Sequence, residues 1–330
     1  MIRRALLFHL LLAVVVSSLS PQLVFAAEPP GGLAMTARQG YVTTDDGVRL
    51  YFHVVGAGAD VVIVPLALYL SPEFDVLASG RALIYYDPRN RGRSDQVTDP
   101  AKLQDLMHRE VEDLEAVRRH FGVDRVDLIG HSYAGIVVGL YAMKYAHHVR
   151  RLVQIGPGQF AYDRQYPAEF TNNDAVRADV FAKLMALQQQ QPPSDPEAAC
   201  RAAWVHLRRL QVWNPDRVDR IGHWGFCELP NERGFLASFN RYMVPSWRNL
   251  GLGSDDFARA TMPTLIIHGL KDRNAPYGGG RDWAVSLPDA RLISIEQAAH
   301  AAWIDAPQLV FDSIAQFLAG TWPAVAAKVQ

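Results

Sequence analysis

Gly130-His131-Ser132-Tyr133-Ala134-Gly135 places a serine among small residues, in a predicted turn between a strand and a helix. The apolar run Arg125–Ile129 comes directly before it, and the segment Ala134–Tyr145 has the composition of a helix. In so tight a turn the flanking positions have no room for large side chains, and the serine hydroxyl is pushed away from the backbone. Ala134 stands where a second glycine is usual, so the motif is a relaxed nucleophile elbow. Taken alone, the turn also fits a helix N-cap.

Two later segments supply the partners that a nucleophilic serine needs. A serine hydroxyl reacts once a neighbouring base takes its proton, and the base needs a third group to fix its tautomer. Asp272 follows the strand-like run Thr264–His268, and His300 follows the strand-like run Ala290–Ile295. Singly, Asp272 also fits a turn cap and His300 a solvated loop histidine. Their order and their places beyond strand ends favour a triad, with Ser132 as nucleophile, His300 as general base and Asp272 as orienting acid.

The other histidines are interpreted as structural residues. His131 and His268 each fall at a predicted strand end, where packing and loop hydrogen bonds commonly use a histidine. His147, His148 and His206 lack a recognisable metal-ligand spacing with carboxylates or cysteines. We therefore expect neither a metal nor a cofactor.

The chain resembles the α/β-hydrolases of the group that contains proline iminopeptidases, esterases, lactonases and carbon–carbon bond hydrolases. Besides the elbow, Asp272 and His300, the stretch Tyr86–Ser94 is similar to the family's Asp-x-Arg-x-x-Gly-x-Ser loop. These pieces are spread over residues 41–318. The resemblance implies an α/β fold with a mostly parallel central sheet flanked by helices, and a Ser-His-Asp triad. It says little about the substrate.

The loop after the predicted strand Val61–Val64 departs from the family pattern. Relatives usually carry His-Gly and a short Gly-rich run there, whereas this chain has Pro65–Tyr69. In the family, this loop and the residue after the nucleophile each supply a backbone N–H to the oxyanion hole. A backbone donor does not depend on side-chain identity, so we assign these roles to Ala67, with Leu66 next in line, and to Tyr133. The altered loop argues against a typical proline iminopeptidase, which would carry His-Gly-Gly-Pro-Gly.

The stretch Arg89–Ser94 carries three arginines in a sequence that favours turns. We interpret these arginines as residues that bridge loops or lie in water. Anion binding is the alternative.

Strand and helix signals alternate along most of the chain. An opening hairpin is expected at Tyr41–Thr44 and Val48–Val55, around an Asp-Gly turn. The clearest helix is Lys102–Phe121, which carries an apolar stripe at helical spacing. Further strands are expected at Val61–Val64, Ala82–Tyr86, Arg125–Ile129 and Arg151–Ile155. This alternation predicts a parallel sheet covered on both faces, formed by residues 40–159 and 259–330.

Between residues 160 and 258 the alternation stops. In the family, an insertion before the acid-bearing strand is a helical cap over the active site, so we predict a cap at 160–258. Most of its aromatic residues are interpreted as the cap's own core, and a minority as the lining of an apolar pocket. These residues are Trp204, Trp213, Trp224, Phe226, Phe235, Phe239, Tyr242 and Trp247.

Four polar residues of the predicted cap leave alternatives open. Glu228 and Glu232 could hold a substrate amine, which would favour an aminopeptidase, although such residues are more often surface charges on helices. Cys200 and Cys227 are the only cysteines, and either a disulfide or two buried thiols is consistent with their spacing.

The N-terminus has the layout of a secretory signal peptide, predicted at residues 1–27. Arg3 and Arg4 precede the apolar run Ala5–Val16, and small residues for cleavage follow at Val24–Ala27. The run is too short for a comfortable transmembrane helix, although an uncleaved anchor is the alternative. We expect a periplasmic or secreted protein without stable membrane insertion after cleavage. Residues 28–39 are expected to be a flexible lead-in.

Composition is that of a soluble globular enzyme. The 330 residues are 49% hydrophobic with a formal net charge of −1, which gives no electrostatic reason to expect nucleic acid as a partner. We predict a serine hydrolase that cleaves an ester or lactone bond of a small to medium, fairly apolar molecule. The alternatives are an aminopeptidase of the proline iminopeptidase type, acting on a short peptide, and a ligand-binding protein that keeps the fold without turnover.

Overall fold

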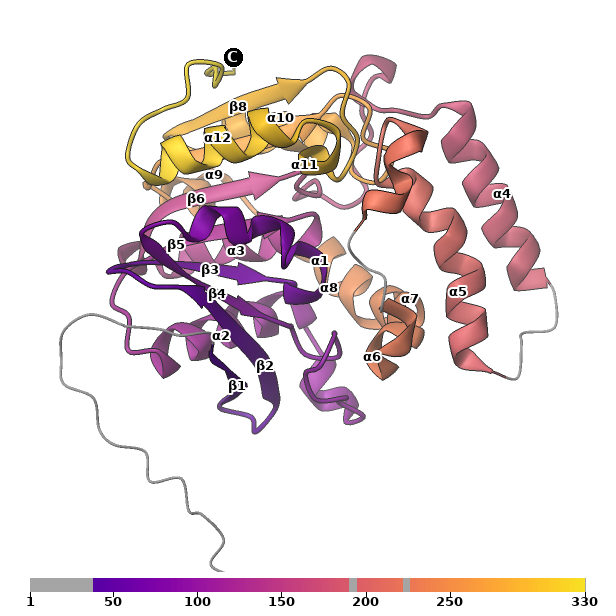
Figure 1. The fold of residues 1–330 in the computed structure, drawn as a ribbon, viewed down its shortest axis with the longest axis horizontal. Coiled ribbons are helices and arrows are strands. Elements are labelled where there is room, and N and C mark those ends of the chain that lie inside the picture. Colours follow the sequence, from indigo (N-terminus) through magenta and orange to yellow (C-terminus); the bar gives the residue numbers. More distant parts are fainter. Residues whose placement is uncertain (1–37, 190–194, 222–225, 330) are drawn as a thin grey trace, which may run out of the picture. The chain divides into compact units, whose positions relative to one another are not determined.

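The computed structural model describes residues 38–189, 195–221 and 226–329 (Figure 1). The predicted signal peptide, residues 1–27, lies outside these ranges, as do residues 28–37 of the predicted lead-in and Trp224 of the predicted cap. None of the helices in the described ranges combines the length and the apolar character needed to cross a membrane.

The described residues form an eight-stranded sheet in the order β1-β2-β4-β3-β5-β6-β7-β8. β2 runs antiparallel to both of its neighbours, and every other pair is parallel. The strands are β1 (Arg38–Thr43), β2 (Arg49–Gly56), β3 (Asp60–Pro65), β4 (Arg81–Tyr86), β5 (Val126–His131), β6 (Val149–Ile155), β7 (Thr264–Gly269) and β8 (Ala290–Ile295). The mostly parallel sheet and the opening hairpin are therefore confirmed.

Helices cover both faces of the sheet (Figure 1), so its inner strands, such as β5 and β7, are buried on both sides. Leu128 packs into the hydrophobic cluster on one face, and its neighbour Ile129 packs into the cluster on the other. The first cluster includes residues of α2 (Leu106–His120), α3 (Tyr133–Lys144) and α10 (Tyr277–Ser286). The second includes residues of α1 (Ala67–Leu70), α11 (Ala302–Asp305) and α12 (Pro307–Leu318).

The helix predicted at Lys102–Phe121 is interrupted near its start. A 3₁₀ turn, Pro100–Leu103, comes first, and α2 begins only at Leu106. Between them Asp105 has φ 51° and ψ 50°, a left-handed conformation that aspartate tolerates better than most residues. Its carboxylate accepts a hydrogen bond from the Ser246 hydroxyl at 2.9 Å. A contact with a residue remote in the sequence thus stabilises the interruption between the 3₁₀ turn and α2. The apolar stripe of the sequence gives no sign of this interruption.

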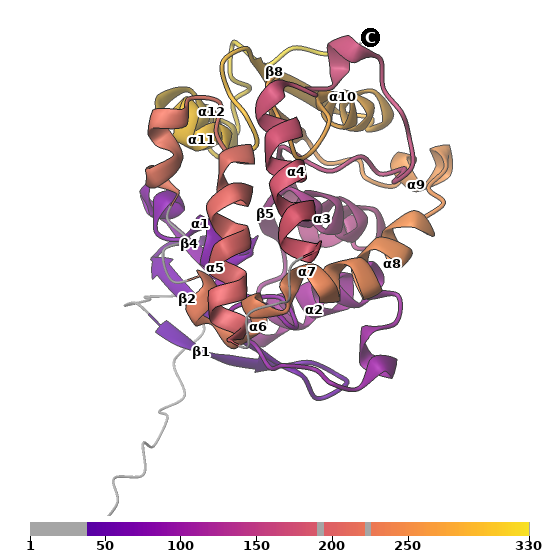
Figure 2. The ribbon, with the colours of Figure 1, turned by 90° about the vertical axis from the view of Figure 1, so that its right-hand side faces the viewer.

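An insertion, residues 156–263, joins β6 to β7. Its helices are α4 (Ala175–Gln189), α5 (Pro196–Leu207), α6 (Pro230–Arg233), α7 (Phe235–Ser238), α8 (Val244–Arg248) and α9 (Ser254–Ala258). In Figure 1 the arrowheads of β6 and β8 point toward the side on which α4 and α5 lie. Figure 2 views the molecule from that side and shows α4 and α5 in front of the sheet. The carboxyl ends of the parallel strands therefore face the insertion.

The aromatic residues of the insertion have two kinds of surroundings. Trp204 and Phe226 stack on each other with ring centroids 4.7 Å apart, and Trp204 also packs against the second cluster of the sheet. Trp247 belongs to the first cluster, beside α2 and α3, and its indole N–H donates to the carbonyl of Gln159 at 2.7 Å. The last helices of the insertion are therefore part of the main hydrophobic core.

Candidate active site

Ser132 lies at a sharp turn between β5 and α3. Its backbone has φ 60° and ψ −129°, an unusual conformation for a residue with a side chain. A Cβ on Gly130 would lie 2.5 Å from the carbonyl oxygen of Ala134, so only glycine fits that position. Ala134 itself is fully buried, and the turn accommodates its methyl group. The local backbone therefore has the strand–turn–helix form that an elbow requires.

Asp272 and His300 form a buried hydrogen-bonded pair. His300 Nδ1 lies 2.7 Å from Asp272 Oδ2, and His268 Nε2 lies 3.2 Å from the same oxygen. The other oxygen, Oδ1, accepts the backbone N–H groups of Asn274 at 2.8 Å and Ala275 at 2.9 Å. Burial would raise the pKa of Asp272, but His300 and the hydrogen bonds from His268 and His300 hold it well below its ordinary value. Asp272 is therefore a carboxylate whose position is fixed.

Gly156, directly after β6, connects the elbow to this pair. The backbone N–H of Ser132 donates to the carbonyl of Ile155 at 3.0 Å. At the next residue, a Cβ on Gly156 would lie 3.2 Å from Asp272 Oδ2 and 3.3 Å from His300 Nδ1. The ends of β5 and β6 and the loops after β7 and β8 thus bring the predicted nucleophile, acid and base to one place. Their catalytic roles stay a prediction.

His131 and His268 contact the members of the pair. The ring of His131 lies 4.4 Å from the His300 ring, and its Nε2 is 3.2 Å from the carbonyl oxygen of His300. His268 lies 3.2 Å from both Asp272 Oδ2 and the carbonyl oxygen of Ala275. Both are buried, and each contacts the backbone of a loop as well as a ring or a carboxylate.

Ala67 and Tyr133 are the first residues of α1 and α3. The first N–H groups of a helix have no acceptor within it, so both are placed to bind another oxygen. The residue before α1, Leu66, has φ 67°, which is uncommon for a residue that is not glycine. The N–H of Leu68 donates to Asp87 Oδ1 at 3.1 Å. Asp87, of the Asp-x-Arg loop, thereby anchors the atypical loop after β3.

Two of the arginines in the Arg89–Ser94 stretch are buried and bound by carboxylates. Arg89 lies 2.6 Å from Asp113 and 2.8 Å from Asp46. Arg91 Nε lies 3.0 Å from Glu232 Oε1. The interpretation of these arginines as loop-bridging residues is confirmed.

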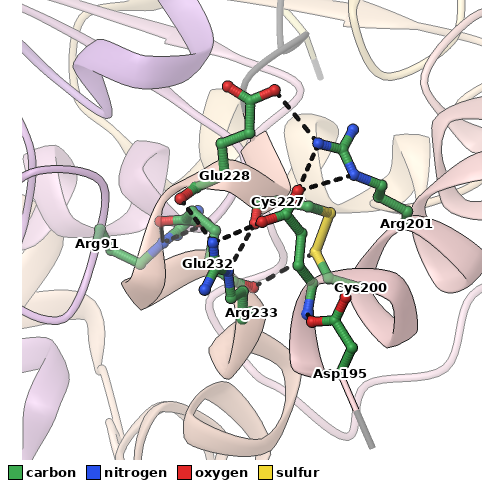
Figure 3. Close-up of a disulfide and its surroundings, with 9 residues drawn as sticks. Arg91, Asp195, Cys200, Arg201, Cys227, Glu228, Glu232 and Arg233 are labelled. Carbon is green, nitrogen blue, oxygen red and sulfur yellow. Dashed lines mark hydrogen bonds and ion pairs between the residues drawn. A yellow bond between two sulfur atoms is a disulfide. The ribbon is translucent and has the colours of Figure 1, made fainter. Parts of the chain in front are cut away.

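Glu232 and Glu228 differ in their surroundings (Figure 3). Glu232 is 2% exposed, so the interpretation as a surface charge is wrong for it. The side chain of Glu232, on α6, is buried, and its carboxylate binds Arg91 and the backbone N–H of Gly92. The Glu228 side chain is 63% exposed and lies 3.2 Å from Arg201. Nothing in the sequence around Glu232 signals its burial, because its partner is remote along the chain.

Cys200 and Cys227 form a disulfide that settles the alternative left open by their spacing. It joins α5 to the 3₁₀ turn Phe226–Glu228, directly before α6 (Figure 3). The bridge therefore restrains the segment from which Glu232 reaches Arg91.

A second contact between insertion and core surrounds His300, and no sequence signal revealed it. Asp305, on α11, accepts the backbone N–H groups of Trp213 at 2.7 Å and Asn214 at 3.2 Å. The N–H of Ala301 donates to the carbonyl of Gln211 at 2.7 Å. The insertion thus binds both ends of the loop and helix that follow His300.

Comparisons with known proteins agree with this architecture. Residues 65–307 match the family model of the alpha/beta hydrolase fold. The chain is 38% identical to a proline iminopeptidase of Saccharolobus solfataricus over 262 residues, which cover 76% of this chain and 80% of that protein. It is 30% identical to the (lyso)-N-acylphosphatidylethanolamine lipase of Mus musculus over 257 residues, which cover 73% of this chain and 72% of that protein.

Solved structures show the same fold at low sequence identity. An esterase from Exiguobacterium antarcticum superposes with a TM-score of 0.65 at 17% identity, covering 84% of this chain and 98% of that chain. A 2-hydroxy-6-oxo-6-phenylhexa-2,4-dienoate hydrolase from Rhodococcus superposes with a TM-score of 0.64 at 17% identity, covering 87% and 100%. This likeness concerns the fold alone.

Proposed function

We propose that this chain, which belongs to the α/β-hydrolase fold family, is a serine hydrolase that cleaves carboxylic ester or lactone bonds through an acyl-enzyme. The observation that carries the proposal is the buried 2.7 Å hydrogen bond between His300 Nδ1 and Asp272 Oδ2, beside the turn that holds Ser132. Because Nδ1 faces the carboxylate, Nε2 is the ring nitrogen that can take a proton from a serine.

The proposed reaction proceeds in two half-reactions. Ser132 Oγ attacks the carbonyl carbon while His300 Nε2 takes its proton, and Asp272 stabilises the imidazolium. The N–H groups of Ala67 and Tyr133 bind the oxyanion. The intermediate collapses, His300 returns the proton to the leaving alkoxide, and an acyl-Ser132 ester remains. Water, deprotonated by His300, then attacks this ester and releases the acid and Ser132.

The charges near the site support an ester over a peptide with an N-terminal amine. An ammonium group binds best to a carboxylate that lacks another cation. Arg91 already neutralises Glu232, and Glu228 lies in an exposed pair with Arg201. The two carboxylates that the sequence singles out are thus engaged. A fairly apolar ester needs no such anchor.

A cap and export are further parts of the proposal. The insertion lies on the side to which the strand ends point and contacts the His300 loop through Gln211, which supports a cap over Ser132 (Figure 2). Disulfides persist in oxidising compartments, so the Cys200–Cys227 bridge supports a periplasmic or secreted location. Detection of the mature chain, lacking residues 1–27, in a periplasmic or culture fraction would test export.

An aminopeptidase is the second candidate. The observation that favours it is the 38% identity to a proline iminopeptidase over 76% of this chain. In this alternative, the substrate amine would have to displace Arg91 from Glu232 or Arg201 from Glu228.

Hydrolysis of p-nitrophenyl esters, lactones and amino-acyl p-nitroanilides tests the proposal. We expect ester turnover that Ser132→Ala abolishes, and labelling of Ser132 by a fluorophosphonate. Ser79→Ala, which changes an exposed serine, is the matched control and should leave both unchanged. Anilide turnover that exceeds ester turnover would favour the aminopeptidase. A wild-type protein without turnover and without labelling would contradict both and favour a ligand-binding protein.

A further inference from the structure

We infer that Arg91 is a positioning residue that holds the two backbone donors of the oxyanion hole in register, and that Glu232 of the insertion fixes Arg91 in place. The inference rests on the proposed function, because it gives a role to a residue outside the triad. It also explains how the loop after β3 can serve without the usual glycine-rich run.

Arg91 contacts the segments of both donors. Its Nη1 donates to the Tyr133 hydroxyl at 3.2 Å, and Tyr133 is the residue whose N–H would bind the oxyanion. Its guanidinium carbon lies 5.2 Å from the centre of the Tyr69 ring. Tyr69 is two residues after Ala67, in the same four-residue helix. One planar cation thus spans the side chains of α1 and of the first turn of α3.

The loop after β3 needs such an external support. A helix as short as α1 is not stable through its own hydrogen bonds, and the residue before it, Leu66, is held at φ 67°. Non-glycine residues keep such conformations only where the surroundings determine them. The Leu68 N–H bound to Asp87 is one restraint, and the contact between Tyr69 and Arg91 is a second.

Glu232 and Phe235 fix the guanidinium of Arg91 from the insertion. Glu232 Oε1 lies 3.0 Å from Nε and Oε2 lies 3.0 Å from Nη2, a bidentate pair. Oε1 also accepts the N–H of Gly92 at 2.7 Å. The ring of Phe235, on α7, lies 3.8 Å from the guanidinium carbon. Lysine could not replace this arrangement, because an ammonium lacks the planar fork that binds several partners at once.

The pair therefore couples the insertion to the oxyanion hole. Burying two charges is costly, so a pair of this kind is weak evidence for a gain in stability. Its position between α6, α1 and α3 instead matches a role in geometry. The Cys200–Cys227 disulfide, directly before α6, restrains the segment that carries Glu232 (Figure 3).

Three variants separate this role from a structural one. Tyr133→Phe removes only the hydroxyl that Arg91 binds, Glu232→Gln weakens the bidentate pair, and Arg91→Lys keeps the charge without the fork. Misplacing an oxyanion donor lowers transition-state binding, so we expect kcat to fall about 10- to 100-fold for Arg91→Lys and less for the other two, with KM within about twofold. Arg201→Gln, which breaks an exposed ion pair on α5, is the control and should keep wild-type kcat.

The measurement is kcat for a p-nitrophenyl ester per active site. The number of active sites is taken from the amount of fluorophosphonate bound when labelling is complete. The affinity of a boronic acid, whose Ser132 adduct resembles the tetrahedral intermediate, should weaken by the same factor as kcat/KM. A purely structural role would lower the melting temperature and the number of active sites, but not kcat per site. Unchanged kcat per site in folded Tyr133→Phe and Glu232→Gln would overturn the inference, even if Arg91→Lys fails to fold. A wild-type enzyme that neither labels nor turns over would instead refute the proposed function.

Discussion

The carboxylate of Asp305 accepts a hydrogen bond at 2.9 Å from the backbone N–H of Ala299, the residue before His300. The oxygen that accepts it, Oδ2, also accepts the N–H of Trp213 at 2.7 Å. One side chain on α11 therefore holds the loop of the proposed base and an extended stretch of the insertion together. The position of His300 depends on this carboxylate as well as on Asp272.

Asp305→Asn is expected to lower both stability and turnover. The amide keeps only one acceptor oxygen for three N–H donors, and unsatisfied buried groups cost about 1–3 kcal/mol. We expect a loss of this size in urea unfolding and a fall in kcat of about tenfold, because His300 is less well placed. Asp312→Asn, which changes an exposed residue on α12 that binds Gln308, should alter neither. Wild-type kcat per active site in Asp305→Asn would contradict this role.

Gly156→Ala is expected to reduce activity more than stability. Gly156 has φ 48°, and its new methyl group would press on Asp272 and His300 at 3.2–3.3 Å. Gly47, in the β1–β2 turn, has φ 81°, and a methyl group there would meet no atom within 4 Å. Gly47→Ala therefore shares only the backbone cost, about 1–2 kcal/mol. Thermal melting should show similar losses for both variants, and only Gly156→Ala should lose ester turnover. Equal ester turnover in Gly156→Ala and Gly47→Ala would show that His300 keeps its function beside the added methyl group.

Glu110, a buried residue of α2, makes stability depend on pH. Burial and the neighbouring Asp113 raise its pKa from 4.5 to about 8, against the opposing charges of Arg91 and Arg89. Between these values only the folded chain keeps the proton, so this group's contribution to stability falls by roughly 1.4 kcal/mol per pH unit and levels off above pH 8. Below pH 4.5 both states carry the proton, and the contribution is complete.

The test is urea unfolding from pH 5 to 9. Glu110→Gln cannot ionise, so its stability relative to wild type should rise across this range. Glu112→Gln changes an exposed residue of the same helix and should follow the wild-type profile. Parallel profiles for all three proteins would show that Glu110 ionises in the folded state as it does in the unfolded state.

The sequence predicts the elements that depend on local pattern. β7 is buried along its whole length and reads as an apolar run because both faces of the sheet are covered there. The limits of β7 and β8 agree closely with the prediction. The order of Ser132, Asp272 and His300 along the chain predicts that three strand ends meet, and the structure brings Asp272 and His300 into contact.

The contacts between insertion and core were beyond prediction. Arg91 and Glu232 are 141 residues apart, and each lies in a polar stretch typical of a surface loop or helix. Their burial follows from how α6 docks against the Asp-x-Arg loop, which no local periodicity encodes. Asp305 likewise has neighbours that suit an exposed helix end. Because no sequence pattern links Arg91 to Glu232, the sequence could not show that these two residues form an ion pair.

The Cys200–Cys227 disulfide closes a ring across a sequence separation of 27 residues. Gln211 and Trp213, which hold the loop and helix around His300, lie inside the ring, and Glu232 follows shortly after it. Within the insertion, α4 lies before this ring, and α6 to α9 lie after it. We therefore expect substitutions on the exposed face of α4, such as at Met185, to disturb the groups around Ser132 less than substitutions within the ring do.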